Sequence, residues 1–159
     1  MTVYFATDHA GLEFKNELLQ YVRDELGYEV EDCGAYEFDE ADDYPDFVHK
    51  AAAAVAEDPE NRHAIVIGAS GQGEAMCANR YKGVRAALYY GPPAVSQVDA
   101  SGKELNMISS SRVHNAANVL SLGARFVSAE DAKVVVKDWL SVPQGTEERH
   151  LRRIKKLDQ

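Results

Sequence analysis

The sequence predicts an α/β protein with a parallel five-stranded sheet, helices on both faces of the sheet and a basic helix at its C-terminus. Short apolar runs rich in β-branched residues alternate with longer segments in which apolar residues recur every three or four positions. The first two runs flank one helical segment, which gives a β–α–β unit with parallel strands and a right-handed crossover. Because 159 residues suffice for one real core, we expect a single domain over residues 1–159.

Apolar periodicity and turn residues place the individual elements. Strands are expected at residues 3–7, 28–33, 63–68, 84–89 and 118–122. Helices are expected at residues 14–26, 46–56, 74–80, 104–111, 129–140 and 147–157. Gly27 is a natural stop for the first helix, and Pro45 suits the first turn of the second, with Asp43 or Tyr44 as its cap.

The second half of the chain contains two further landmarks. Residues 90–103 include Gly-Pro-Pro and are expected to form a loop insertion, the place for a lid or a variable insert. Ser128, three residues before Asp131, resembles a capping box at the start of the fifth helix. The last helix lies within residues 144–159, where arginine and lysine are concentrated.

Composition and charge exclude several classes of function. The formal charge of −9 and the pI near 5.0 argue against a surface that coats nucleic acid or binds an anionic membrane. Asp8 and His9 interrupt the first apolar run, so no signal peptide is expected, and no segment is long enough to span a bilayer. Cys33 and Cys77 lack a metal-ligand spacing and are expected to be reduced and buried. A cytoplasmic protein is the default expectation.

A loop of small residues from Gly68 to Gly73 carries the third strand into its helix. Such a junction leaves unpaired backbone N–H groups directed at one spot, which favours a phosphate, a carboxylate or a developing enediolate. The loop lacks the lysine and hydroxyl of a P-loop, and its glycines do not fit a dinucleotide fingerprint. Glu74 stands at its mouth. The alternatives are a plain connecting loop and, for Glu74, a first-turn acid favoured by the helix dipole.

Charged residues elsewhere leave similar alternatives. Asp8 follows the first strand, where it could be a helix cap, and His9 could be an exposed first-turn residue. The acidic loop over residues 34–43 could suggest a cation site, but its spacing favours a solvated surface loop. Arg149 and Arg153 share one helix face, which suits a phosphate clamp, although basic residues at a helix end also complement its dipole.

These residues, taken in order, resemble the ribose-5-phosphate isomerase B family, which includes the galactose-6-phosphate isomerase subunits. The matching pieces are Asp8-His9-Ala10-Gly11, Asp43-Tyr44-Pro45, Ser70-Gly71-Gln72-Gly73-Glu74, Ala78-Asn79, Gly83-Val84-Arg85-Ala86, His114-Asn115, Gly123-Ala124-Arg125 and Arg149-His150 with Arg153. The resemblance implies a Rossmann-like sheet and a cofactor-free, metal-free isomerisation of a phosphosugar in carbohydrate metabolism. It also implies a homodimer, with tetramers as an alternative, and active sites at the subunit interface.

The resemblance also implies roles for individual residues. Asp8 and His114 would assist ring opening, while Ser70 and the loop amides around Gly71 and Gly73 would stabilise the enediolate. The phosphate would be held by His9, Arg125, Arg149 and Arg153. Tyr44 and Asn115 would line the sugar site.

Two departures from the family pattern concern the base and the substrate. Many members carry a base cysteine two residues before the Ser/Thr position, and Gly68 stands there in this chain. The chain resembles the subgroup with glutamate after the second loop glycine, so Glu74 is expected to be the carbon base. The span from Leu88 to His114 is longer than the family's usual spacing between these two positions. Ribose 5-phosphate is the expected substrate, with a four- or six-carbon phosphosugar such as galactose 6-phosphate, or sugar-phosphate binding without catalysis, as alternatives.

Overall fold

The computed structural model describes residues 1–92, 98, 102, 104 and 106–158. Its strands are β1 (Thr2–Thr7), β2 (Glu29–Asp32), β3 (Arg62–Gly68), β4 (Ala86–Tyr89) and β5 (Val119–Gly123). Its helices are α1 (Leu12–Gln20), α2 (Tyr44–Glu57), α3 (Gln72–Ala78), α4 (Met107–Asn115), α5 (Ala129–Ser141) and α6 (Glu148–Ile154). A 3-10 turn, η1 (His9–Gly11), precedes α1, and a π-helical turn, η2 (Tyr21–Glu25), follows it. Most of the loop insertion predicted at 90–103 lies outside the described residues.

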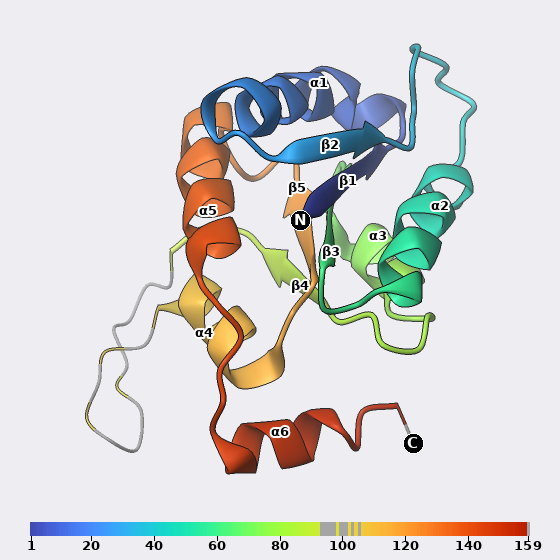
Figure 1. The fold of residues 1–159 in the computed structure, drawn as a ribbon. Helices are drawn as coiled ribbons and strands as arrows, with labels where there is room; N and C mark the ends of the chain where they lie inside the picture. Colours follow the sequence, from blue (N-terminus) through green and yellow to red (C-terminus); the bar gives the residue numbers. More distant parts are fainter. Residues whose placement is uncertain (93–97, 99–101, 103, 105, 159) are drawn as a thin grey trace.

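The strands form one sheet in the order β2-β1-β3-β5-β4, and every neighbouring pair is parallel (Figure 1). This confirms the predicted α/β fold with a five-stranded parallel sheet. Thr7 of β1 lies opposite Ile67 of β3, and Gly68 lies opposite Gly123 of β5. The residues that follow β1, β3 and β5 therefore share one edge of the sheet, which is where open α/β sheets bind ligands.

Side chains alternate across the sheet and build a core on each face. Val3, Phe5 and their counterparts on β3 and β5 pack with α1, α4 and α5, where Trp139 is fully buried. Tyr4 and Ala6 point to the other face, which α2 and α3 cover. Burial of both faces explains the continuous apolar runs, because a strand covered on two sides has no exposed positions to alternate with.

The boundaries of α4 and α6 differ from the sequence-based prediction. α4 begins at Met107, because the Asn106 side chain accepts hydrogen bonds from the backbone N–H groups of Ile108 and Ser109. It continues to Asn115 and ends where Ala116 adopts a left-handed conformation with φ 49°. His114 and Asn115 therefore lie in the last helical turn, rather than beyond the helix. α6 is shorter than the predicted 147–157, and residues 155–158 form turns.

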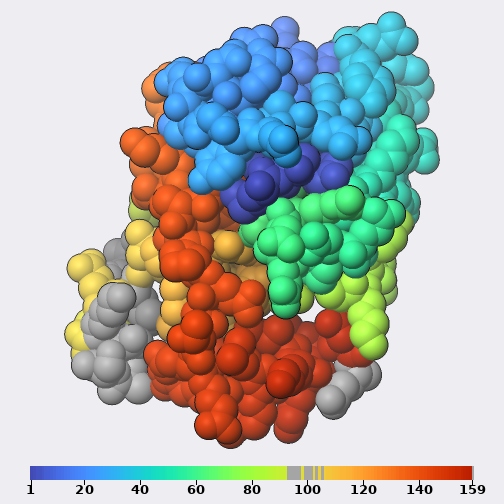
Figure 2. All heavy atoms as spheres, in the orientation of Figure 1, coloured from blue at the N-terminus to red at the C-terminus, as the bar shows by residue number. Residues whose placement is uncertain are grey.

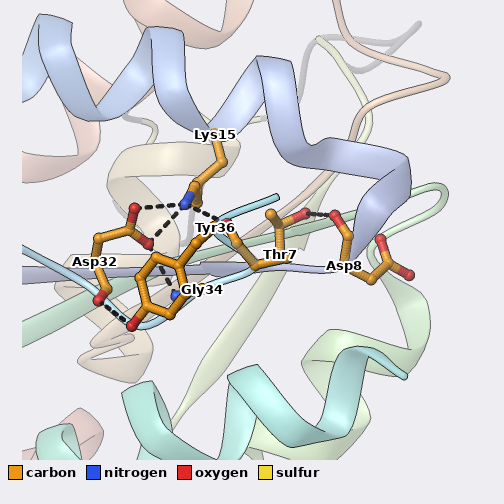
Figure 3. Close-up of polar contacts among 7 residues, drawn as sticks. Thr7, Asp8, Lys15, Asp32, Gly34 and Tyr36 are labelled. Carbon is orange, nitrogen blue, oxygen red and sulfur yellow. Dashed lines mark hydrogen bonds and ion pairs between the residues drawn. The ribbon is translucent and has the colours of Figure 1, made fainter. Parts of the chain in front are cut away.

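A buried lysine fixes the chain at the end of β1 (Figure 3). The Lys15 ammonium donates to both carboxylate oxygens of Asp32, each at 2.6 Å, and to the carbonyl of Ala35 at 2.8 Å. The same segment pairs with β1, because the Thr7 amide donates to Gly34 and the Thr7 carbonyl accepts from Ala35. Lys15 thereby holds the segment that pairs with Thr7, the residue directly before Asp8.

Both cysteines are free and buried, as predicted. Within the described part of the chain, no helix has the length and apolar character needed to cross a membrane.

Candidate active site

Asp8, Ser70, Glu74 and Arg125 all follow strands that end at the same edge of the sheet. Asp8 caps η1, since its carboxylate accepts a hydrogen bond from the amide of Ala10 at 3.0 Å. The cap uses one carboxylate oxygen, so capping and a chemical role are compatible. Arg125 is exposed, and its amide donates to the carbonyl of Ala69 at 3.2 Å, which sets it beside the small-residue loop.

Glu74 lies in the first turn of α3 with only 4% of its surface exposed. A Cβ atom added to Gly68 would overlap the Glu74 carboxyl group, so this carboxyl occupies the space that a side chain at position 68 would need. Burial raises the pKa of Glu74, its own backbone N–H opposes that rise, and the negative charge of Asp8 adds to it. A desolvated carboxylate beside a second acid is suited to general acid–base catalysis.

The loop between β3 and α3 is shaped by close backbone approach. Gly71 has φ 74°, which favours glycine, and its carbonyl accepts from the Ser121 hydroxyl at 2.6 Å. Ser70 accepts a hydrogen bond from the amide of Gln72 at 3.3 Å. A Cβ atom on Gly73 would lie 2.7 Å from the hydroxyl of Tyr44, so this ring closes over the loop. The predicted site residues Ser70, Gly71 and Gly73 therefore lie in the segment that leads into Glu74, and Tyr44 packs against its end.

His9 is held by an acid that sequence reasoning did not single out. Asp42 Oδ1 lies 2.6 Å from His9 Nδ1 and also accepts from the His9 amide at 3.1 Å. The Asp42 side chain is only 10% exposed, so the prediction that residues 34–43 form a plain solvated loop is wrong at this position. The hydrogen bond that Asp42 accepts raises the pKa of His9, desolvation opposes the rise, and the nearby charges of Asp8 and Asp39 add to it.

A cavity of about 570 Å³ lies beside His9 and is lined by residues of η1 and α1, with Phe38 and Ala124. A protonated imidazole facing this space would attract an anion. Within the described residues, Asp8, His9 and Asp42 are the group whose ligand atoms approach closely enough to hold a metal, within 4.8 Å of one another. The ion pair between His9 and Asp42 accounts for that proximity without a metal.

A second group of predicted site residues lies elsewhere. His114 is in the last turn of α4, and its ring stacks on the ring of His150 with centroids 4.3 Å apart and planes 17° apart. Ser110 Oγ lies 2.9 Å from His114 Nδ1. Arg149 and Arg153 lie one turn apart on α6, and the Arg149 guanidinium donates to Glu147 at 2.8 Å. Asn115 is exposed beside His114.

The two groups occupy opposite edges of the sheet. α4 leads into the start of β5, so His114 lies near the amino ends of the strands, whereas Asp8 and Glu74 follow the carboxyl ends of β1 and β3. The five residues of β5 span about 15 Å, which a histidine side chain cannot bridge. α6 and residues 155–158 lie at one end of the molecule, below α4 in Figure 1. In the space-filling view of Figure 2, the red C-terminal residues fill the same end.

Comparison with known proteins now settles the family. A family model described as Ribose/Galactose Isomerase matches residues 3–157. The chain belongs to this family. Ribose-5-phosphate isomerase B of Mycobacterium tuberculosis (strain ATCC 25618 / H37Rv) is 34% identical over 154 residues, which cover 97% of this chain and 86% of that protein. The enzyme of the same name from Escherichia coli (strain K12) is 33% identical over 155 residues, with coverage of 98% and 93%.

Solved structures of ribose-5-phosphate isomerase B agree with the fold of this family member. The Clostridium thermocellum protein superposes with a TM-score of 0.84 at 34% identity, covering 99% of this chain and 95% of that one. The Mycoplasma genitalium protein, with bound ribulose-5-phosphate, gives a TM-score of 0.83 at 33% identity, with coverage of 98% and 93%. The resemblance drawn from the ordered motifs is confirmed, and the glutamate in place of a cysteine remains a prediction.

Three contacts among the candidate site residues were not predicted from the sequence. Asp42 is one of several acids in its loop, and no periodicity marks it as the partner of His9. The Ser110–His114 contact follows from the four-residue spacing of a helix, but the predicted helix ended before His114. The stacking of His150 on His114 joins two helices that are far apart in the sequence, so only the folded chain reveals it.

Proposed function

We propose that this chain is an aldose–ketose isomerase that interconverts ribose 5-phosphate and ribulose 5-phosphate. The observation that carries the proposal is the Glu74 carboxylate, buried beneath Gly68, with a raised pKa and Asp8 beside it. The names of the family relatives and the ribulose-5-phosphate bound in the Mycoplasma genitalium structure support the same substrate pair.

The reaction begins with opening of the sugar ring. Asp8 accepts the proton of the O1 hydroxyl, the O1 electron pair forms the carbonyl, and the bond between C1 and the ring oxygen breaks. His114 donates a proton to the departing ring oxygen. Asp8 is suited to the first transfer because it directly follows β1 at the sheet edge and uses only one carboxylate oxygen to cap η1. The products of this step are the open aldehyde, a protonated Asp8 and a neutral His114.

Hydrogen transfer between carbons follows. Glu74 removes the proton from C2, the electrons move onto O1, and the enediolate forms. The Ser70 hydroxyl and the backbone amides of Gly71 and Gly73 stabilise the developing negative charge. The proton of the C2 hydroxyl then passes to O1, Glu74 returns its own proton to C1, and the carbonyl forms at C2. This sequence needs neither a metal nor a redox cofactor, because every step moves only protons and electron pairs within the substrate and its acid–base partners.

The phosphate and the rest of the sugar require the remaining residues. His9, with Asp42 raising its pKa, offers a positive charge beside the cavity, and Arg125 stands exposed at the same edge. Arg149 and Arg153, one turn apart, supply a guanidinium pair for the phosphate. Tyr44, which closes over Gly73, and Asn115 line the sugar between these ends.

The complete site needs two copies of the chain. His114, Asn115, Arg149 and Arg153 lie at the amino edge, so a second copy would present them to the carboxyl edge of the first. Phe38 and Phe126 support an interface there, because they are 68% and 64% exposed although they adjoin His9 and Gly123. We expect a homodimer in solution, with two equivalent sites and with pairing into tetramers as a further outcome. The free cysteines and the phosphosugar substrate suit the cytoplasm.

The test is a panel of four-, five- and six-carbon aldose phosphates, each measured as kcat/KM with a chelator present. We expect ribose 5-phosphate to give the highest value and the chelator to leave it unchanged. A higher value for a six-carbon sugar would move the assignment within the Ribose/Galactose Isomerase family. Binding without exchange of solvent hydrogen into the substrate would indicate a sugar-phosphate-binding protein instead.

A further inference from the structure

His114 has two close side-chain neighbours that the proposed reaction does not use. Ser110, one helical turn earlier on α4, places its hydroxyl oxygen 2.9 Å from His114 Nδ1. His150 of α6 stacks on the His114 ring at a centroid distance of 4.3 Å. Together they restrain the ring, because the hydrogen bond fixes its rotation and the stack fixes its plane.

The proposed ring opening decides which atom of this hydrogen bond carries the proton. An imidazolium that donates from Nε2 carries hydrogen on both ring nitrogens, and both are then donors. Ser110 Oγ, 2.9 Å from Nδ1, therefore accepts from the Nδ1–H group. A ring that keeps its proton on Nδ1 presents Nε2 as the nitrogen that exchanges a proton with a ligand.

His150 cannot share that task. Its side chain is 6% exposed, and its Nε2 atom is buried without a hydrogen-bond partner among the described residues. Desolvation lowers the pKa of His150, and His114, Arg149 and Arg153 act in the same direction, while Glu147 opposes them. A neutral ring stacked on His114 orients it and ties α4 to the helix that carries Arg149 and Arg153.

We infer that Ser110 is a positioning residue, which holds the proton of His114 on Nδ1 and aims Nε2 at the ring oxygen of the sugar. This rests on the proposed function, in which His114 donates a proton during ring opening. In that step the Nε2–H bond breaks, the proton passes to the ring oxygen as its bond to C1 breaks, and Nδ1–H stays with Ser110. The serine itself gains and loses no proton.

The inference separates two parts of the reaction. Ring opening applies to the cyclic aldose phosphate. A five-carbon 2-ketose phosphorylated on O5 cannot close a five-membered ring, so exchange of its C1 hydrogen with solvent needs the carbon base alone. Loss of Ser110 should therefore slow aldose isomerisation and leave ketose exchange unchanged, whereas general damage to the fold would lower both.

The experiment compares wild type, Ser110→Ala, Ser110→Thr and Ser111→Ala. Ser111 is a matched control, because its hydroxyl donates to the backbone carbonyl of Ile108 at 2.7 Å on the same helix. We expect Ser110→Ala to lower kcat for ribose 5-phosphate by about three- to ten-fold, with ketose exchange within about two-fold of wild type. Ser110→Thr should restore kcat, and Ser111→Ala should match wild type in both assays.

Nitrogen-15 spectra of His114 supply an independent reading, in which wild type should show the proton on Nδ1 and Ser110→Ala should show less of that form. Equal kcat values for Ser110→Ala and Ser111→Ala, an equal loss of isomerisation and exchange, or an unprotonated Nδ1 in wild type would each overturn the inference. These failures presuppose an active wild-type enzyme. A wild-type chain without isomerase activity would instead remove the proposed function.

Discussion

Glu74 and Gly68 fit together as a pair, because the carboxyl group of one fills the space that the missing side chain of the other leaves. A carboxylate placed there is removed from water, which makes its charged form less favourable and its basicity greater. The small residue at the end of β3 is therefore part of the proposed site, although it brings no functional group. The burial that suits Glu74 to its proposed proton transfer also costs the fold stability.

Replacing Glu74 by glutamine tests both consequences. Glu74→Gln should lower kcat by about 100-fold or more, because the amide cannot accept the carbon-bound proton. It should also raise Tm at pH 8, by up to about 4 °C, because the buried charge is gone. Glu130→Gln, at an exposed first-turn acid of α5, is the control and should change neither quantity. Activity within a few-fold of wild type would remove Glu74 from the mechanism.

The direction of the Glu74 pKa shift fixes how stability depends on pH. With the folded-state pKa raised, the unfavourable contribution is absent below the ordinary glutamate pKa and grows as the pH rises through the folded-state value. The Tm difference between Glu74→Gln and wild type should therefore shrink on acidification. A difference that stays constant from pH 8 to pH 4 would contradict a buried, ionised Glu74.

The pH dependence of wild-type activity should report the ionisation of Glu74. Because the base acts only when ionised, kcat/KM should fall on acidification with a midpoint above the ordinary glutamate pKa. Asp8 contributes to the shift, so Asp8→Asn should move this midpoint to lower pH as well as slow the reaction. The measurement is kcat/KM across the acid range for both proteins, and an unmoved midpoint would show that Asp8 does not act on Glu74.

At the scale of elements, Lys15 anchors the segment that follows β2 against the end of β1. Its ammonium is fully buried between Asp32 and the carbonyl of Ala35, and the segment it holds pairs with Thr7, the residue before Asp8. Since Asp32 is 30% exposed, solvent screens part of the charge left behind when Lys15 is removed. The anchor therefore contributes less than a wholly buried ion pair would.

Lys15→Met should lower the free energy of unfolding by about 2–3 kcal/mol, because it leaves Asp32 without its partner and one buried carbonyl without a donor. Urea unfolding measures this loss. The comparison is Arg23→Met, which breaks the exposed pair between Arg23 and Asp24 and should cost less than about 0.5 kcal/mol. Similar losses in both variants would show that Lys15 is not an anchor.

Sequence patterns located the strands well, because buried parallel strands read as short apolar runs that glycines and helices separate. They located Asp8, Ser70 and Glu74 for the same reason, since residues after parallel strands must meet at one edge. The predicted start of α4 was wrong, because the helix begins where the Asn106 side chain caps it rather than where the apolar periodicity begins. Asp42 was misjudged, because its burial follows from a contact with His9 across 33 positions of the chain.

At the scale of the whole molecule, we propose that one chain carries two half-sites on opposite edges of its sheet. One half-site contains the acids and the small-residue loop, and the other contains His114 with the arginines of α6. Within a chain β5, about 15 Å long, lies between the two groups of residues. Two copies related by a two-fold axis would bring unlike halves together twice, which is the common arrangement for a homodimer.

Mixing two damaged proteins tests this most directly. Glu74→Gln disables one half-site, and the double variant His114→Ala with Arg153→Ala disables the other. If sites are shared, unfolding and refolding an equal mixture gives hybrid dimers with one intact site each, and activity should recover to about 25% of wild type. If each chain builds its own site, every site in the mixture stays damaged and activity remains at the average of the two parent variants.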